Sequence, residues 1–288
     1  MEGRYNSMVK TIAAWKLNAD GAEPEKININ AETLDEGTRQ LPSGGYTTFR
    51  TFDRFRVLRL HEHFERLEES ARLAGKPVIM NVPCIRQSLR MALESFPAAE
   101  SRVRLTLDLE DKPGTVYALA EILHVPSVME YQRGVMAVTR TLHRNNPKAK
   151  LTNFIATAAE VRKTLPQGIN EAVMIGEDGH ALEGLSSNFF GVRGGVVWTA
   201  EEGVLSGITR SLVLDEIRAQ GLPLRLEGVP VGEIAELDEA FITSASRAVL
   251  PVTVIDDRPV GNGKPGPVTR GLMEGYKARI EAALEEIN

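Results

Sequence analysis

Lys150 is the residue of this sequence whose type and position best suit covalent chemistry. It lies within residues 147–154, between an extended run at residues 135–142 and an apolar-periodic run that follows. A lysine at such a strand-to-helix junction can point its amine into a cavity, where burial or neighbouring cations such as Arg144 lower its pKa and make it a nucleophile. Lysine is seldom buried unpaired, so a solvated loop lysine is the ordinary alternative. Lys148 is the nearest rival for the reactive role.

The second candidate is Glu183, which lies within residues 181–190. It precedes a glycine and small polar residues on the way into a predicted strand, and this arrangement would let its carboxylate enter a cavity. A carboxylate placed there can hold the nitrogen of a pyridine ring protonated, which makes the ring an electron sink. Considered alone, Glu183 is more typical of a solvated surface turn.

An anion site is indicated by residues 203–210, which run directly into a predicted helix. The backbone N–H groups of Gly207, Ile208 and Thr209 at the start of that helix would face an anion. The Thr209 hydroxyl could bind the same anion or cap the helix. An ordinary helix cap is the alternative for these three residues.

Arg66 is the candidate cation for the same anion, because a guanidinium group binds phosphate through a rigid fork. Its alternative is an ion pair on a helix surface with Glu62 or Glu69. His61 and His63 are two residues apart and therefore lie on different sides of that helix, so we expect no metal site.

The composition favours small-molecule chemistry in a globular protein. The 288 residues are 42% hydrophobic and 25% charged, and the formal net charge of -5 without a basic run argues against a nucleic-acid partner. One cysteine, Cys84, excludes an internal disulfide and a cysteine metal cluster, which fits a reducing cytoplasm. Residues 1–10 contain no apolar leader core, and no stretch approaches the about 18 apolar residues of a membrane span. We therefore expect a soluble cytoplasmic protein without a membrane partner.

The first half of the chain has the pattern of an α+β domain. Apolar alternation is strict from Val103 to Leu109, which predicts a half-buried strand. A helix is predicted from His61 to a stop at Gly75, and another follows at residues 85–96. Further strands are predicted at residues 10–15, 26–30, 46–52 and 116–124.

The second half is predicted to form its own domain after a connection near residues 125–133, where a proline and mixed polarity interrupt the pattern. Helices are predicted at residues 153–165, 209–220 and 272–284, and strands at residues 135–142, 172–175, 189–192, 196–199, 224–229, 240–243 and 252–255. The predicted division is an N-terminal α+β domain at residues 1–128, a connection at 129–134 and a cofactor-binding domain at 135–288.

Together these motifs resemble the fold type IV pyridoxal phosphate enzymes, which include branched-chain and D-amino acid aminotransferases, R-selective amine transaminases and aminodeoxychorismate lyase. The resemblance runs from about Tyr46 to Tyr276. The motifs that carry it, in the family's order, are residues 62–67, 150–153, 183–190, 207–210 and 250–252. It implies a two-domain α+β fold, with a small N-terminal α/β sandwich and a larger C-terminal pseudo-barrel, and a homodimer.

The resemblance also implies the cofactor, pyridoxal 5'-phosphate, and the residues that hold it. Lys150 would be the Schiff-base and proton-transfer lysine, as it stands three residues before Asn153. Glu183 would pair with the ring nitrogen and Leu205 would pack on the ring face. The remaining cofactor contacts implied are Tyr46 beside the ring, and Arg66, Gly207, Ile208, Thr209 and Ser246 around the phosphate.

On the substrate side the resemblance implies Arg104 and Thr48, which lie on strands that bring substrate-binding groups. Arg247 is unusual at its position, and we consider it as a ligand of the substrate carboxylate or as a surface ion pair. Ala245 stands where the family commonly has a threonine, which makes a contact from Ser246 less secure.

Two reactions are compatible with these motifs. A transaminase moves an amino group between an amino acid or amine and a 2-keto acid, and residues 183–188 and 207–210 resemble D-amino acid and related transaminases. The alternative is a lyase that releases pyruvate and 4-aminobenzoate from aminodeoxychorismate, whose pattern Thr47 and Thr48 resemble. Residues 185–188 lack the usual Gly-Glu-Asn ending of the branched-chain enzymes. We favour the transaminase. A catalytically silent binding protein would have lost one of the cofactor groups, and the sequence retains them all.

Overall fold

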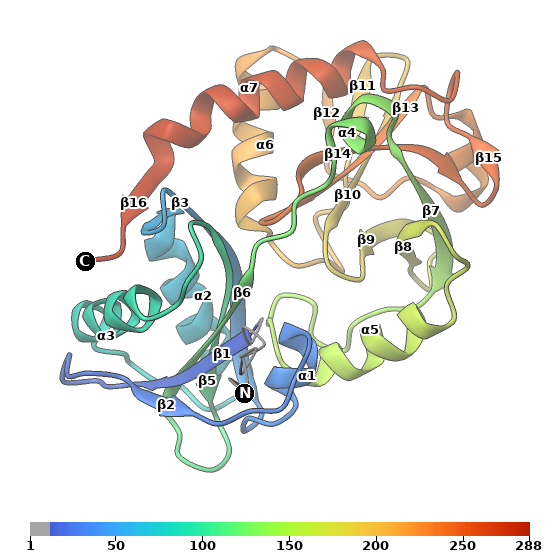
Figure 1. Ribbon diagram of the computed structural model, residues 1–288. Coiled ribbons are helices and arrows are strands. Elements are labelled where there is room, and N and C mark those ends of the chain that lie inside the picture. Colours follow the sequence, from blue (N-terminus) through green and yellow to red (C-terminus); the bar gives the residue numbers. More distant parts are fainter. Residues whose placement is uncertain (1–11) are drawn as a thin grey trace, which may run out of the picture.

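The computed structural model of this protein describes residues 12–288 and contains two β-sheets. The first sheet combines strands from both ends of that range (Figure 1). Its antiparallel strands are ordered β16-β4-β3-β5-β6-β1-β2. Their bounds are β1 Ile12–Leu17, β2 Glu25–Ile27, β3 Gly44–Phe52, β4 Arg56–Leu58, β5 Ser101–Asp108, β6 Val116–Ile122 and β16 Leu284–Glu286.

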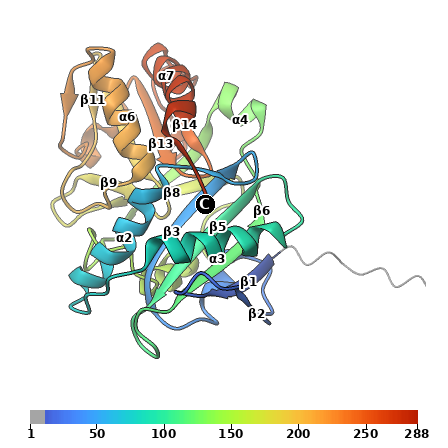
Figure 2. The same ribbon diagram turned by 90° about the vertical axis from the view of Figure 1, so that its left-hand side faces the viewer.

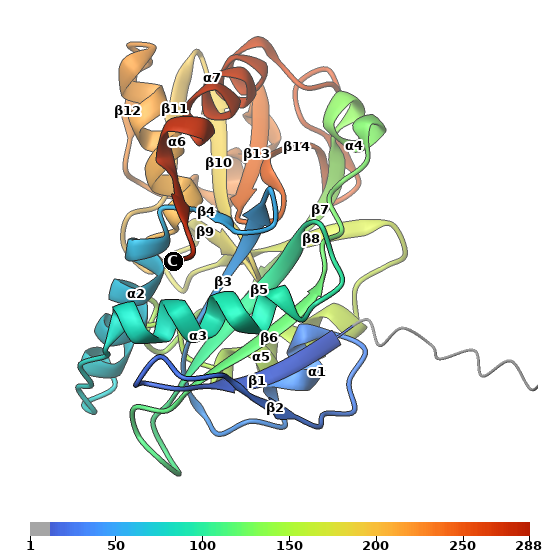
Figure 3. The ribbon, with the colours of Figure 1, turned by 60° about the vertical axis from the view of Figure 1, so that its left-hand side comes forward.

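Strand alternation gives this sheet one apolar face and a second face, the polar face, on which charged side chains lie beside a smaller apolar cluster around Leu119. On β5, Val103 and Leu105 lie in an apolar core with the helices α2 (Leu60–Leu73) and α3 (Val82–Glu94), which cover that face (Figure 3). Arg102 and Arg104 alternate with them, because successive side chains of a strand point to opposite faces. The polar face is therefore the one that can contribute to a site.

The second sheet closes on itself into a barrel. Its strands are ordered β12-β11-β10-β13-β14-β7-β8-β9, and β9 pairs again with β10 through Glu183 and Asn188. The predicted pseudo-barrel is thus confirmed. The bounds are β7 Val135–Thr141, β8 Ile169–Ile175, β9 Ala181–Gly184, β10 Asn188–Arg193, β11 Val196–Trp198, β12 Leu224–Arg225, β13 Glu239–Ser244, β14 Ala248–Ile255 and, paired with β14, β15 Arg258–Pro259.

Helices cover the barrel where its strands present a second apolar face. Phe189 of β10 packs inside the barrel, and its neighbour Phe190 packs outside against α6 (Ile208–Ala219) and α7 (Pro267–Ala283). Figures 1 and 2 show α6 and α7 together on the barrel. Opposite faces of one strand therefore belong to two separate cores.

Several predicted elements differ from those observed. Residues 128–133, predicted as a connection, contain the helix α4 (Val128–Arg133), which begins with a capping box between Ser127 and Glu130 rather than with an apolar stripe. The short helix α1 (Leu34–Thr38) and the 3-10 helix Val231–Glu236 were not predicted.

Other differences concern element ends. The strand predicted at residues 224–229 ends at Arg225, and the last predicted helix ends at Ala283, so that Leu284 begins β16. Residues 10 and 11 of the first predicted strand lie outside the described residues. The domain division at residues 129–134 stays a prediction, and β16 shows that the end of the chain returns to the first sheet. No helix within residues 12–288 has the length and apolar character to cross a membrane.

Candidate active site

One cavity of about 540 Å³ is lined by residues of both sheets and of the helices between them. Every residue predicted for the site from the sequence lines it. These residues are Tyr46, Thr48, Arg66, Arg104, Lys150, Glu183, Leu205, Gly207, Ile208, Thr209, Ser246 and Arg247.

Lys150 lies in the predicted junction, on the loop between β7 and the helix α5 (Asn153–Lys163). Its backbone oxygen accepts a hydrogen bond from Tyr46 N at 2.8 Å, and its backbone N–H donates to Ser70 Oγ at 3.0 Å. Thr152 N donates to Gly44 O at 2.9 Å. A Cβ at Gly44 would lie 1.8 Å from a carbonyl oxygen of β5, so only glycine fits there. The lysine of the second half is thus fixed by β3 and α2 of the first half.

The amine of Lys150 lies among cations. Burial lowers the pKa of Lys150 well below its ordinary value, and the charges of Arg66, Arg144 and Arg104 lower it further, whereas Glu183 opposes them. A lysine with such a pKa is available as a neutral nucleophile. A lowered pKa is the condition under which a lysine at this junction was expected to act as a nucleophile.

Lys148, the rival lysine, points elsewhere. Its Nζ donates to the backbone oxygen of Glu201 at 2.7 Å and lies 3.7 Å from the exposed carboxylate of Glu202. Lys148 is absent from the residues that line the cavity. Of the two lysines, Lys150 is therefore the one that lines the cavity.

Glu183 is a buried carboxylate with one acceptor atom left over. Its Oε2 accepts from Leu205 N and Asn188 Nδ2, each at 3.2 Å. Its Oε1 lies 2.9 Å from Arg144 Nε but, among the described residues, has no partner with hydrogen-bond geometry. Burial raises the pKa of Glu183, although Arg144 and the Leu205 N–H act against it. An unused buried acceptor in a cavity wall fits a ring N–H donor.

The helix α6 begins at the cavity. Gly207 is its N-cap and has no side chain, so the first N–H groups of α6 have no side-chain cap within the described part of the chain. The Thr209 hydroxyl does not cap the helix, as one alternative had it, because Gly207 is the N-cap of α6. Burial raises the pKa of Tyr276 to about 12. The helix start is thus available to an anion.

Arg66 approaches this helix start from α2. Its Nη2 donates to the backbone oxygen of Ser206, two residues before α6. The alternative ion pairs with Glu62 and Glu69 are not formed, because those carboxylates pair with other arginines. Burial lowers the pKa of Arg66 to about 10. The helix start and an arginine that has no ion-paired carboxylate among residues 12–288 therefore lie together where they could hold one anion.

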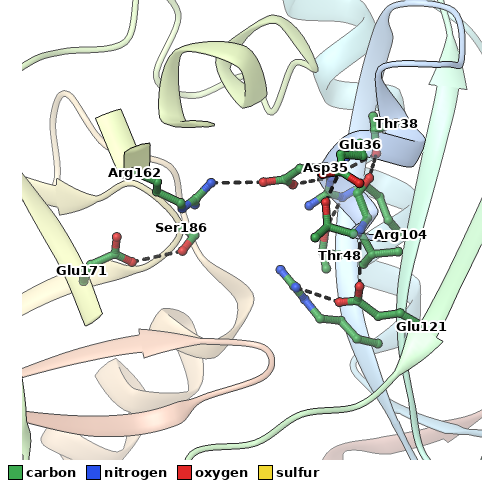
Figure 4. A network of polar contacts seen from close by, with 12 residues as sticks. Asp35, Glu36, Thr38, Thr48, Arg104, Glu121, Arg162, Glu171 and Ser186 are labelled. Carbon is green, nitrogen blue, oxygen red and sulfur yellow. Dashed lines mark hydrogen bonds and ion pairs between the residues drawn. The ribbon is translucent and has the colours of Figure 1, made fainter. Parts of the chain in front are cut away.

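Tyr46 lies beside both Lys150 and Arg104 of β5. Its ring centroid is 5.0 Å from Lys150 Nζ and 5.0 Å from Arg104 Cζ. Arg104 Nε donates to Thr48 Oγ1 at 3.1 Å, and its Nη1 pairs with Asp35 (Figure 4). The alternation of β3 and β5 thus places these side chains together on the polar face.

Arg247 forms an ion pair, but with a buried partner. Its Nη2 lies 2.7 Å from Oε2 of Glu171, whose side chain is 2% exposed, and it also donates to Ser186 Oγ at 3.0 Å. Its Nη1 donates to Asn170 Oδ1 at 2.9 Å. Ser246 precedes it in the same turn between β13 and β14. Most donors of Arg247 are therefore already used within the protein.

Sequence reasoning did not assign a site role to several residues that line or support this cavity. Asn188 bridges Glu183 and Leu205, and it could have been suspected only from its closeness to Glu183 along the chain. Asp35 and Arg162, in contrast, are 127 residues apart, and no local pattern relates them. The pair Glu171 and Arg247 is separated by 76 residues in the same way.

The cavity is therefore lined by an amine of lowered pKa, a buried carboxylate oxygen that accepts no hydrogen bond from the described residues, and a helix start beside an arginine that could hold an anion. An anionic pyridine aldehyde is the chemical class that would use all three groups at once. Comparison with known proteins agrees with this. The family described as "Amino-transferase class IV" matches residues 44–255.

Curated relatives match three quarters or more of this chain. The D-alanine aminotransferase of Bacillus licheniformis is 28% identical over 92% of this chain and 97% of that protein. The branched-chain-amino-acid aminotransferase of Pseudomonas aeruginosa is 25% identical over 76% of this chain and 77% of that protein. Relatives with both names are thus similarly distant from this chain.

Solved structures share the fold. The T.th. branched-chain amino acid aminotransferase with pyridoxamine 5'-phosphate has a TM-score of 0.76 at 22% identity, covering 96% of this chain and 98% of that one. The Escherichia coli branched-chain amino acid aminotransferase has a TM-score of 0.77 at 19% identity, covering 96% and 99%. At such identities the likeness establishes the two-domain α+β fold.

Proposed function

The chain belongs to the class IV aminotransferases, which are pyridoxal phosphate enzymes, and from this premise we propose that Lys150 is its reactive amine. The proposed reaction moves an amino group between an amino acid or amine and a 2-keto acid. The observation that carries the proposal is Oε1 of Glu183, which is ion-paired with Arg144 but accepts no hydrogen bond from residues 12–288, in the wall of the same cavity that holds the Lys150 amine and the start of α6.

The residues of the cavity fit the cofactor group by group. Arg66 and the N–H groups of Ile208 and Thr209 would hold the phosphate, since a helix start and a guanidinium fork both favour that anion. Glu183 Oε1 would accept the ring N–H. Leu205, whose backbone N–H and oxygen are both hydrogen-bonded beside Glu183, would pack on the ring face.

When bound, the cofactor supplies an aldehyde for an amine and a ring that accepts an electron pair. Lys150 Nζ would bond that aldehyde in the absence of substrate, and it would carry a proton from the α-carbon of the amino donor once the donor replaces it. Glu183, oriented by Arg144 and Asn188, would keep the ring nitrogen protonated. Tyr46 would exclude water on one side of the amine.

The lyase alternative receives no support from the comparisons, in which the relatives described above are aminotransferases. Its sequence signal was the pair Thr47 and Thr48. Thr47 Oγ1 is hydrogen-bonded to His63 Nδ1 at 2.6 Å, and Thr48 accepts from Arg104. Both hydroxyls therefore have structural partners that require no particular reaction.

A homodimer is part of the same proposal, as the family resemblance implies. Sedimentation equilibrium of the holoenzyme would give twice the mass of the chain. A monomer that remains active would contradict it.

The reactive amine is tested by Lys150→Ala, with Lys148→Ala as the matched control. Borohydride reduction followed by peptide mapping should place the reduced cofactor on Lys150 in the unchanged protein and in the control. Lys150→Ala should show no reducible visible band. A reducible band in that variant would contradict the assignment.

The reaction is tested by giving the holoenzyme a panel of L- and D-amino acids and R-amines, and separately aminodeoxychorismate. A transaminase converts its cofactor to the amine form with at least one donor. Release of pyruvate from aminodeoxychorismate without that conversion would show a lyase. The active donors also decide between branched-chain and D-amino acid specificity.

A further inference from the structure

Two arginines share one aspartate at the wall of the cavity that contains Lys150. Arg104 Nη1 lies 2.8 Å from Asp35 Oδ1, and Arg162 Nη1 lies 3.1 Å from Asp35 Oδ2. Asp35 comes from α1, Arg104 from β5 and Arg162 from α5, so the bridge joins the first sheet to a helix of the second half (Figure 4). All three residues line the cavity.

The bridge contains two positive charges and one negative charge. Within residues 12–288, Asp35 is the carboxylate within ion-pair distance of either arginine. The other partners of Arg104 are neutral hydroxyls, those of Thr48 at 3.1 Å and Thr38 at 3.0 Å. Because the Arg104 side chain is only 5% exposed, water compensates its charge poorly. The pair of arginines is therefore an anion site that Asp35 occupies.

Asp35 is ionised at neutral pH. Burial raises the pKa of Asp35, but the charges of Arg104, Arg162 and Arg102 outweigh burial, so that the pKa lies below its usual value. Arg102 itself pairs with Glu121 at 2.9 Å. Asp35 thus supplies, from within the protein, the negative charge that Arg104 and Arg162 need.

The site is within reach of the reaction centre. Lys150 Nζ and Arg104 Cζ are each 5.0 Å from the centroid of the Tyr46 ring, so they are at most twice that distance apart. A substrate whose α-carbon lies at the Lys150 amine could therefore reach Arg104 with a side chain of the length of glutamate. A second carboxylate on that side chain would compete directly with Asp35.

We propose that Asp35 is a specificity-determining residue, whose carboxylate fills the place where the second carboxylate of a dicarboxylic amino acid or keto acid would otherwise bind. The inference rests on the proposed function. The enzyme accordingly selects donors and acceptors with neutral side chains. A keto acid of the pyruvate type is a better acceptor than one that carries a second carboxylate.

The first test compares Asp35→Asn with Glu36→Gln, a matched control that removes one charge from the same helix. The Glu36 carboxylate accepts from the backbone of Glu32 and contacts neither arginine. We expect the ratio of kcat/KM for glutamate to that for norvaline to rise about tenfold in Asp35→Asn, equivalent to about 1.4 kcal/mol, and to stay unchanged in the control. A lower ratio would show instead that Asp35 orients Arg104 to bind the second carboxylate, and an equal change for both donors would show a purely structural residue.

The second test measures binding without turnover. Glutarate and valerate have the same length and differ by one carboxylate, and calorimetry gives their affinity for each holoenzyme. Asp35→Asn should bind glutarate about tenfold more tightly than the unchanged protein, whereas the affinity for valerate should change by less than twofold. Equal affinities for glutarate in both proteins would overturn the proposal.

A second variant at the same position keeps the proposal testable if Asp35→Asn does not fold. Asp35→Ala leaves the Thr33 cap of α1 in place, and circular dichroism shows whether either variant is folded. In a folded Asp35→Ala protein we expect the same tightening toward glutarate, and its absence there also overturns the proposal. Tighter glutarate binding in a protein that converts no amino donor would support the role of Asp35 and count against the proposed reaction alone.

Discussion

Lys150 and Glu183 are held in states that cost the folded protein free energy. The amine is buried among Arg66 and Arg144, and the carboxylate keeps one oxygen without a hydrogen bond among the described residues. Groups in such states are common where a ligand completes the site, because the ligand satisfies what the protein leaves open. The cost should therefore be measurable in the protein without its cofactor.

Lys150→Met should stabilise the cofactor-free protein at pH 7. The pKa of Lys150 is lower in the folded protein than its ordinary 10.5, so between the two values the unfolded chain binds more protons and the stability of the unchanged protein rises with pH. The variant lacks this proton linkage. Urea unfolding at several pH values should show its advantage shrinking as the pH approaches 10.5. Lys148→Met is the control, and an advantage that grows with pH would contradict the lowered pKa.

Glu183→Gln should lower kcat about 100-fold, equivalent to about 2.7 kcal/mol, while leaving the cofactor bound. The amide keeps an acceptor for the Leu205 N–H but loses the charge that favours a protonated ring nitrogen. Cofactor content is measured by its absorbance after release in alkali, and kcat with the best donor. A kcat within twofold of the unchanged protein would remove Glu183 from the proposed role.

Helices and strands with a regular apolar pattern could be predicted from the sequence. Elements that depend on a helix cap or on pairing with a distant strand could not. The alternation on β5 indicated both its core face and, by exclusion, the face of Arg104. The helix α4 is six residues long with no buried residue, so its capping box was the only signal. β16 is a strand because Leu284 pairs with Leu58 of β4. The two residues are 226 positions apart along the chain, so no local sequence pattern indicates their pairing.

The same distinction applies to the candidate site. Short motifs, each about ten residues long or less, predicted that Lys150, Glu183 and the start of α6 belong to one cavity. The partners that orient or neutralise them are distant in sequence. Asp35 beside Arg162, for example, depends on how α1 meets α5, and this contact follows from the packing of the two halves.

Gly207→Ala should weaken the cofactor site through the element that it caps. A Cβ at this position would lie 2.0 Å from Asn188 Oδ1, and Asn188 connects Glu183 to Leu205. We expect about tenfold weaker cofactor binding and a loss of about 1–3 kcal/mol in the free energy of unfolding. Gly232→Ala is the control, since no atom lies within 4 Å of its added Cβ. Equal cofactor affinity in both variants would show that the helix start tolerates the displacement.

The cavity depends on contacts that cross between the two sheets. The loop of Lys150 is hydrogen-bonded to β3 and α2, and the Asp35 bridge joins α1 to α5. The third crossing is β16, which follows α7 of the barrel and pairs with β4 of the first sheet. Since each sheet contributes part of the cavity wall, loosening any crossing should affect both the stability and the site.

Ile287 tests the third crossing, because it fixes the end of the chain in the core of the first sheet. Its side chain is fully buried there, and its backbone N–H donates to Phe55 O at 2.8 Å. Ile287→Ala should lower the free energy of unfolding in urea by about 2–4 kcal/mol, since a buried isoleucine loses both burial and packing. Ile79, which is 95% exposed, supplies the matched control, and Ile79→Ala should change that free energy by less than about 0.5 kcal/mol.

Because α7 also contributes Tyr276 to the cavity, Ile287→Ala should release the cofactor at a lower urea concentration than the control variant does. Equal unfolding midpoints for the two variants would mean that β16 is not needed to connect the barrel to the first sheet.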